Sequence, residues 1–349
     1  MEKKSFFEKI HNKGFTWHDN LLISSLLVWF LVLVGSVVGQ LVILPFGKLI
    51  ADEGFWSIFF MYFSTIGTWI FAVAYMAITK YNRPIFRALW KDAAGNNFRM
   101  LLIGLLAGFG MNAFCVLCAY LHKDIYIYFD HLDMIKFLAL FAVVFIQSSS
   151  EELVCRAFHY QRLRKGYKNP LVAIIVNGVI FMTLHLFNDG MNAMSVISIV
   201  IIAVLYSFVI YYFDSIWFGM AAHAAWNFTQ NILFGLPNSG IVSPYSVFKL
   251  DASTARSTWI YDVGFGVEGT VLANIVTVIA IVIVILLGRK YGRQELNVWE
   301  GFTYLTRKQK KEAEAQKAAV NDIDPDMTAE TVADMDPDTT VETVTENKD

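Results

Sequence analysis

The chain has 349 residues, of which 56% are hydrophobic, 15% aromatic and 17% charged, with a formal net charge of −2. This composition is too apolar for an ordinary soluble domain of this length and indicates an integral membrane protein. Nothing in the composition or charge suggests a nucleic-acid partner.

Long apolar stretches recur along the chain. A helix needs about 20 mainly apolar residues to cross the hydrocarbon core of a bilayer. The sequence therefore predicts an all-α fold, a polytopic membrane helix bundle of about eight transmembrane helices within residues 21–290. In chain order we expect these helices at about 21–45, 55–79, 100–121, 135–159, 170–188, 192–213, 215–235 and 267–288. Two Gly-x-x-x-Gly pairs, at 35–39 and 104–108, provide small faces where neighbouring helices can approach closely.

Basic residues precede the first predicted span and fill the loops after the second and fourth spans and the segment after the last. By the positive-inside rule, both termini are cytoplasmic and the loop 236–266 is external. The segment 1–20 is then a cytoplasmic N-terminal segment, and 291–349 a cytoplasmic tail. This tail is charged, Thr-rich and short of apolar residues, so we expect it to be largely disordered.

Few ionisable side chains fall inside the predicted spans, and such groups usually face a bundle interior or a wet cavity. Glu152 and Arg156 are four residues apart on the fourth span, so they share a helical face and can pair. Glu151 lies about 100° around the same helix. It is left as a desolvated carboxylate beside another acid, suited to accepting and returning protons. His159 lies near the predicted end of this span, where hydration is the simplest account.

Three further polar residues lie on other spans. His185 is on the fifth, and His223 and Asn227 are four residues apart on the seventh. An imidazole and a carboxamide on one face can both donate hydrogen bonds, which suits a developing oxyanion. His185 can act with Glu151 on a water molecule. Each residue alone is as often a hydrogen bond between helices as a functional group. Together they match the set of residue types found in a hydrolytic active site.

Three ordered motifs on these helices resemble those of the CAAX-processing and bacteriocin-processing membrane proteases, the CPBP or Abi family, which includes the type II CAAX prenyl endopeptidases. They are E-E-x-x-x-R at 151–156, F-x-x-x-H at 181–185 and H-x-x-x-N at 223–227. The resemblance covers roughly residues 95–290. The chain has Cys155 and Ala157 where the family often has an aromatic residue and Gly. The resemblance implies that the first Glu and the F-x-x-x-H histidine activate water while the H-x-x-x-N pair holds the oxyanion.

The stretch GFGVEGT at 264–270 is similar to bacterial members and places Glu268 at the head of the last span. We interpret Glu268 as a charged helix start. We expect a multi-pass protein of a bacterial cell membrane, embedded in the lipid bilayer.

The expected activity is that of an intramembrane endopeptidase acting on a membrane-associated or lipidated peptide or protein substrate. Glu151, His185 and His223 also have the ligand types of a zinc site. No H-E-x-x-H motif occurs in the chain, and we favour a mechanism with no metal cofactor. One alternative is a non-catalytic immunity or scaffold protein in which the same residues bind a peptide. The other is a proton-coupled transporter with Glu151 as carrier, which the lack of an evident inverted repeat disfavours.

Overall fold

The computed structural model describes residues 5–51 and 54–302, and one compact unit extends from Met1 to Leu296. The predictions for the tail beyond residue 302 lie outside the described residues. In chain order the elements are α1 (Phe6–Ile10), α2 (Leu21–Ile43), α3 (Gly47–Ile50), α4 (Phe55–Phe63), α5 (Ile66–Ile78), α6 (Phe86–Leu89), α7 (Phe98–Leu121), β1 (Ile127–Phe129), α8 (Met134–Glu152), α9 (Gln161–Gly166), α10 (Pro170–Thr183), α11 (Ala193–Phe213), α12 (Ile216–Asn227), β2 (Phe248–Leu250) and α13 (Val271–Tyr291). Helical turns of the π type, Leu153–Tyr160 and Phe228–Leu233, continue α8 and α12.

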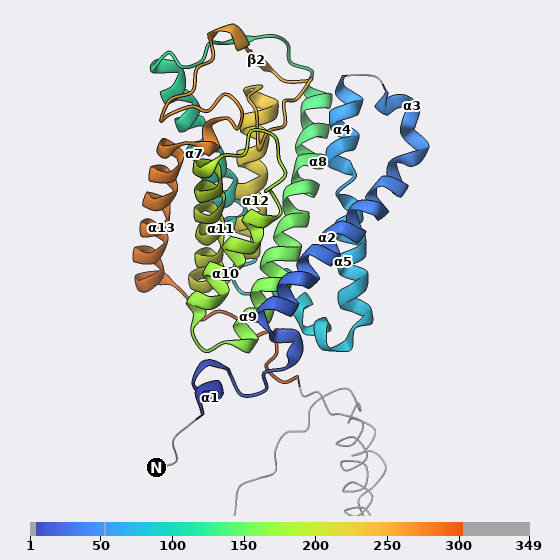
Figure 1. The fold of residues 1–349 in the computed structure, drawn as a ribbon, viewed down its shortest axis with the longest axis vertical. Helices are drawn as coiled ribbons and strands as arrows, with labels where there is room; N and C mark the ends of the chain where they lie inside the picture. Colours follow the sequence, from blue (N-terminus) through green and yellow to red (C-terminus); the bar gives the residue numbers. More distant parts are fainter. Residues whose placement is uncertain (1–4, 52–53, 303–349) are drawn as a thin grey trace, which may run out of the picture. The chain divides into compact units, whose positions relative to one another are not determined.

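The fold is the predicted all-α, polytopic helix bundle (Figure 1). Among the described residues, six helical segments are long and apolar enough to cross a membrane: Leu21–Ile50, Phe55–Ile78, Phe98–Leu121, Met134–Gly166, Ala193–Phe213 and Val271–Tyr291. The remaining two predicted spans are also helical but shorter or differently built. The fifth is the short apolar helix α10. The seventh is α12, in which every residue except Trp217 is buried, so this helix is an inner element of the bundle.

Both Gly-x-x-x-Gly pairs lie where helices meet. A Cβ at Gly108 would come 2.1 Å from the carbonyl oxygen of Ala222, so α7 can approach α12 this closely only with glycine. A Cβ at Gly39 would come 1.9 Å from the carbonyl oxygen of Ser64, in the turn between α4 and α5. Both predicted small faces therefore lie at helix contacts, and the face at 104–108 sets the position of the buried helix α12.

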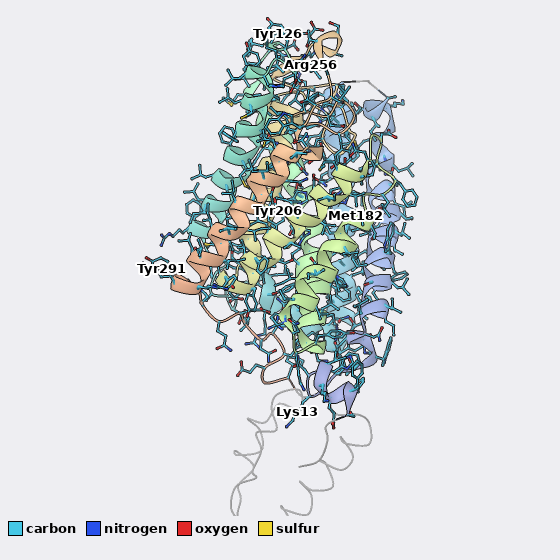
Figure 2. All side chains as sticks on the ribbon, turned by 60° about the vertical axis from the view of Figure 1, so that its left-hand side comes forward. Lys13, Tyr126, Met182, Tyr206, Arg256 and Tyr291 are labelled. Carbon is cyan, nitrogen blue, oxygen red and sulfur yellow. The ribbon has the colours of Figure 1, made fainter. Side chains whose placement is uncertain are left out.

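The loops at one end of the bundle are joined by a short antiparallel sheet. Strand β1 pairs with β2, with Ile127 opposite Leu250. This sheet connects the segment after α7 to the long loop 236–266. Figure 2 shows Arg256 of this loop and Lys13 of the N-terminal segment at opposite ends of the bundle, with Tyr206 between them. The loop therefore lies at the end opposite the N-terminal segment, and which end faces the cytoplasm stays a prediction.

His159 does not lie at a hydrated helix end, so that expectation was wrong. Its side chain is fully buried. Nε2 lies 3.3 Å from the Ser25 hydroxyl, and Nδ1 lies 3.2 Å from the side-chain amide nitrogen of Asn177. The physical reason is that the helical segment continues to Gly166, which leaves His159 inside the bundle between α2 and α10.

Candidate active site

Three sequence-predicted residues meet at one carboxylate oxygen. Glu151 Oε2, on α8, lies 3.8 Å from Nε2 of His185 and 3.7 Å from Nε2 of His223. The side chains come from three elements: α8, the turn after α10, and α12. Both separations are too long for a direct hydrogen bond. Oε2 is buried and has no hydrogen-bond partner among the described residues.

The contacts on the far side of each imidazole assign its tautomer. His185 Nδ1 lies 2.9 Å from the carbonyl oxygen of Phe181, which can only accept a hydrogen bond. His223 Nδ1 lies 3.0 Å from Glu152 Oε1. We therefore place the proton of each ring on Nδ1. In the neutral form each Nε2 then presents a lone pair to Glu151, so three acceptor atoms converge on one point.

Glu152 contacts His223 on the side of the ring that faces away from Glu151. Its Oε1 accepts a hydrogen bond from Arg156 Nη1 at 3.0 Å, and both side chains are fully buried. The same oxygen accepts from His223, as described above. The Arg156 guanidinium also lies 4.2 Å from the ring centroid of Phe181, a cation–π contact. The predicted Glu152–Arg156 pair is therefore present, and it extends to two residues of the other motifs.

Asn227 does not touch Glu151 directly. Its amide Nδ2 donates to Gln147 Oε1 at 3.2 Å and to the Ser148 hydroxyl at 3.3 Å. Gln147 Nε2 in turn donates to Glu151 Oε1 at 2.6 Å. Sequence reasoning missed Gln147. The signal was available, because Gln147 precedes Glu151 by four residues and so lies on the same helical face.

His185 reaches the site from beyond the end of its helix. The fifth span was predicted to run to residue 188, but α10 ends at Thr183, and the backbone N–H of His185 closes a turn onto Met182 O at 2.9 Å. The fourteen residues of α10 rise only about 21 Å. This shortness lets His185 meet Glu151 at the same level of the bundle.

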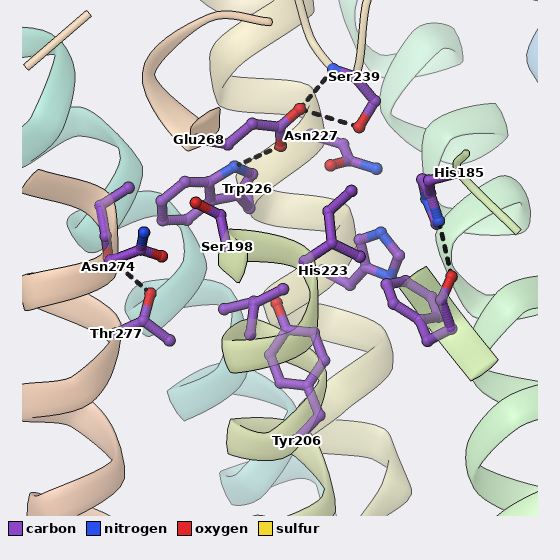
Figure 3. A pocket seen from close by; sticks show the side chains of 14 residues that line it. His185, Ser198, Tyr206, His223, Trp226, Asn227, Ser239, Glu268, Asn274 and Thr277 are labelled. Carbon is purple, nitrogen blue, oxygen red and sulfur yellow. Dashed lines mark hydrogen bonds between the residues drawn. The ribbon is translucent and has the colours of Figure 1, made fainter. Parts of the chain in front are cut away.

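A pocket opens beside these residues, lined by the ends and faces of α10, α11, α12 and α13 (Figure 3). Its wall combines apolar and aromatic side chains with polar groups: Phe181, His185, Ser198, Ile199, Ile202, Tyr206, His223, Trp226, Asn227, Ser239, Glu268, Ala273, Asn274 and Thr277. Ser239 belongs to the loop 236–266, which lies at the end of the bundle opposite the N-terminal segment (Figure 2). The pocket therefore reaches toward that end of the bundle.

Glu268 is not a helix start, so that interpretation was wrong. The N-cap of α13 is Thr270, whose side chain accepts from the backbone N–H of Ala273. Glu268 lies in the preceding turn and lines the pocket with His223 and Asn227. Asn238 of the loop 236–266 contacts Asn227 of α12, and the turn that follows this loop brings the Glu268 carboxylate to the pocket.

The three converging atoms do not match a zinc site well. Ligands at about 2.1 Å from a tetrahedral zinc ion lie about 3.4 Å from each other. The measured separations of 3.7 Å and 3.8 Å are wider. Within residues 5–51 and 54–302, no group of three or more His, Cys, Asp or Glu side chains has metal-binding geometry. We therefore derive no step through a metal ion.

Comparison with protein-family models finds a match within the chain. Residues 133–229 match the family model described as type II CAAX prenyl endopeptidase Rce1-like. This region extends from the residue before α8 to the π-helical turn after α12, and it holds all three motifs. No curated protein and no solved structure matches the chain.

Proposed function

We propose that this chain, which is assigned to the CAAX protease family by its Rce1-like region 133–229, is an intramembrane endopeptidase. The observation that carries the proposal is the placement of Glu151 Oε2 within 3.8 Å of Nε2 of both His185 and His223. One water molecule at this point can donate one hydrogen bond to Glu151 Oε2 and the other to Nε2 of one of the two histidines, as activation by a general base requires.

Glu151 is proposed to be the general base, with His185 accepting the second hydrogen bond of the water. Glu151 takes one proton as the water oxygen bonds to the carbonyl carbon of the scissile peptide. The C–N bond then breaks, and the proton held by Glu151 passes to the leaving nitrogen. The second proton of the water remains on the new carboxyl group and passes to the amine, so the products are a carboxylate and an ammonium group, and Glu151 is returned to its starting state.

His223 and Asn227 are proposed to stabilise the oxyanion. For this role His223 carries a proton on each ring nitrogen, so that it donates from Nδ1 to Glu152 and from Nε2 to the oxyanion. The Asn227 amide supplies a second donor, at present used in bonds of 3.2 Å and 3.3 Å to Gln147 and Ser148. Both bonds are long. A developing oxyanion is charged and is therefore a stronger acceptor than the Gln147 amide oxygen or the Ser148 hydroxyl.

The substrate is proposed to be a membrane-associated or lipidated peptide. The pocket next to Glu151 is walled largely by aromatic and aliphatic side chains, including Phe181, Ile199, Tyr206 and Trp226. Such a wall favours an apolar segment of a peptide that approaches from the bilayer. No metal is needed for the steps above, so we propose that activity persists in the presence of a chelator.

Quantitative mass spectrometry of membrane peptides tests this proposal. Cells that express the wild-type chain are compared with cells that express Glu151→Ala at the same abundance. The proposal expects a matched pair of fragments, divided at one peptide bond, in the wild-type cells alone. Identical peptide profiles would favour a non-catalytic binding role for the same residues.

A further inference from the structure

Glu268 is joined to the candidate active site by hydrogen bonds. Its Oε1 accepts from the backbone N–H and, at 2.9 Å, from the hydroxyl of Ser239. Its Oε2 accepts from Trp226 Nε1 and from Asn238 Nδ2, each at 3.2 Å. Figure 3 shows the carboxylate above Asn227, between Trp226 and Ser239. One side chain thus ties the loop at 238–239 to helix α12.

Asn238 connects this carboxylate to Asn227. Besides its bond to Glu268, Asn238 Nδ2 donates to Asn227 Oδ1 at 3.3 Å. A carboxylate only accepts hydrogen bonds. Asn238 must therefore direct its NH₂ group to Glu268. Because the same NH₂ group also donates to Asn227, Asn227 must direct its side-chain oxygen to Asn238.

The orientation of the Asn227 amide in turn determines that of the Gln147 amide, which contacts Glu151. With its oxygen bound to Asn238, Asn227 turns its NH₂ group toward Gln147 Oε1 and the Ser148 hydroxyl. Gln147 then directs its own NH₂ group to Glu151. The carboxylates of Glu268 and Glu151 lie at the two ends of this series of hydrogen bonds, and they determine the orientation of each amide between them. Without the carboxylates, the amides could adopt either orientation.

We infer that Glu268 is a positioning residue that, through Asn238, holds the Asn227 amide with its NH₂ group toward the reacting carbonyl. This inference rests on the proposed role of Asn227 as an oxyanion donor. Without Glu268, Asn238 and Asn227 lose the group that selects their orientation, and Asn227 can present its oxygen to the oxyanion instead of its NH₂ group.

The test uses purified full-length protein and a cleavable membrane peptide. Glu268→Gln and Asn238→Ala should each lower kcat about 10–100-fold, the scale expected for a misplaced catalytic group, with KM changed less than threefold. In an Asn227→Ala background, Glu268→Gln should cause no further loss. Ser253→Ala is the matched control, because this exposed residue of the same loop bonds to Asp251 and does not line the pocket. Unchanged kcat in both variants, or losses that multiply with Asn227→Ala, would overturn the inference.

A second readout needs no activity. In protein labelled with ¹⁵N-asparagine, the side-chain NH₂ signal of Asn227, identified by its loss in Asn227→Asp, should move in Glu268→Gln and stay in place in Ser253→Ala. An unmoved signal contradicts the inference even if wild-type protein proves inactive. Wild-type inactivity with a moved signal contradicts only the proposed function.

Discussion

Gln147 Nε2 donates to Glu151 Oε1 at 2.6 Å from one turn earlier on α8, and this bond leaves Oε2 to face the two histidines. The carboxylate has one oxygen anchored and one oxygen available for chemistry. A general base needs such an orientation, since proton transfer depends on geometry before it depends on proton affinity.

Gln147→Ala should therefore lower kcat about 10–100-fold with little change in stability, because Glu151 is then free to rotate away from the histidines. Ser150→Ala is the control on the same helix, since that hydroxyl bonds to the backbone carbonyl of Gln147. Initial-rate kinetics on both purified variants check the expectation. Equal kcat for wild type and Gln147→Ala would show that Glu151 needs no anchor.

Glu151 and Glu152 should differ in what their loss affects. Glu152→Gln leaves the fully buried Arg156 without a compensating charge, a change that costs about 3–5 kcal/mol, and it also removes the carboxylate behind His223. We expect reduced abundance and reduced thermal stability. Glu151→Gln leaves the Arg156 pair intact and should accumulate normally while losing turnover. Membrane abundance and Tm in detergent measure this difference, and normal accumulation of both variants would contradict it.

Gly108→Ala should disturb the site from a distance. The added methyl group meets Ala222 O at 2.1 Å, on the helix that carries His223, so α12 must shift. Overpacking of this kind costs about 1–3 kcal/mol, and we expect a lower Tm together with lower activity. Gly110→Ala, on the same helix with no atom within 4 Å of the new Cβ, is the matched control. Equal Tm values for the two variants would show that the contact between α7 and α12 is not tight.

Asp124 should anchor the loop end in a pH-dependent manner. Burial opposes its ionisation, but hydrogen bonds from Thr258, His122 and Arg256 hold the pKa of Asp124 below its usual value. A lowered pKa contributes stability above the unfolded-state value, about 3.9. That stability is lost as pH falls through the lower, folded-state value. Asp124→Asn should therefore destabilise the protein by about 1–3 kcal/mol at neutral pH.

The effect of Asp124→Asn should begin to shrink below about pH 4, where the carboxylate of the unfolded chain takes up a proton, and should be lost as pH falls through the folded-state pKa of Asp124. Hydrogen exchange of the strand Phe248–Leu250 measures it. Asp130→Asn is the control, since Asp130 pairs with Lys249 at 3.0 Å in a partly exposed position where an ion pair contributes little. A loss that is independent of pH would contradict this role of the Asp124 charge.

Local helical periodicity made much of the site predictable. The pairing of Glu152 with Arg156 and the small faces at Gly104 and Gly108 follow from four-residue spacing on a helix. The position of His185 did not follow, because an apolar run does not reveal where α10 ends and a turn begins. The contacts of Glu268 depend on how the non-periodic loop 236–266 folds back, which spacing along the chain does not encode. Gln147 was readable by the same spacing rule and was overlooked.

The central claim is that Glu151 activates a water molecule for peptide hydrolysis, and ¹⁸O labelling tests it most directly. Purified wild-type protein and Glu151→Gln are reconstituted in liposomes with membrane proteins from cells that lack the chain, in H₂¹⁸O. The account predicts fragments whose new C-terminal carboxylate carries one ¹⁸O atom, formed by the wild type and absent with Glu151→Gln at equal protein concentration. Labelled fragments formed equally by both proteins, or no fragments with wild type, would contradict it.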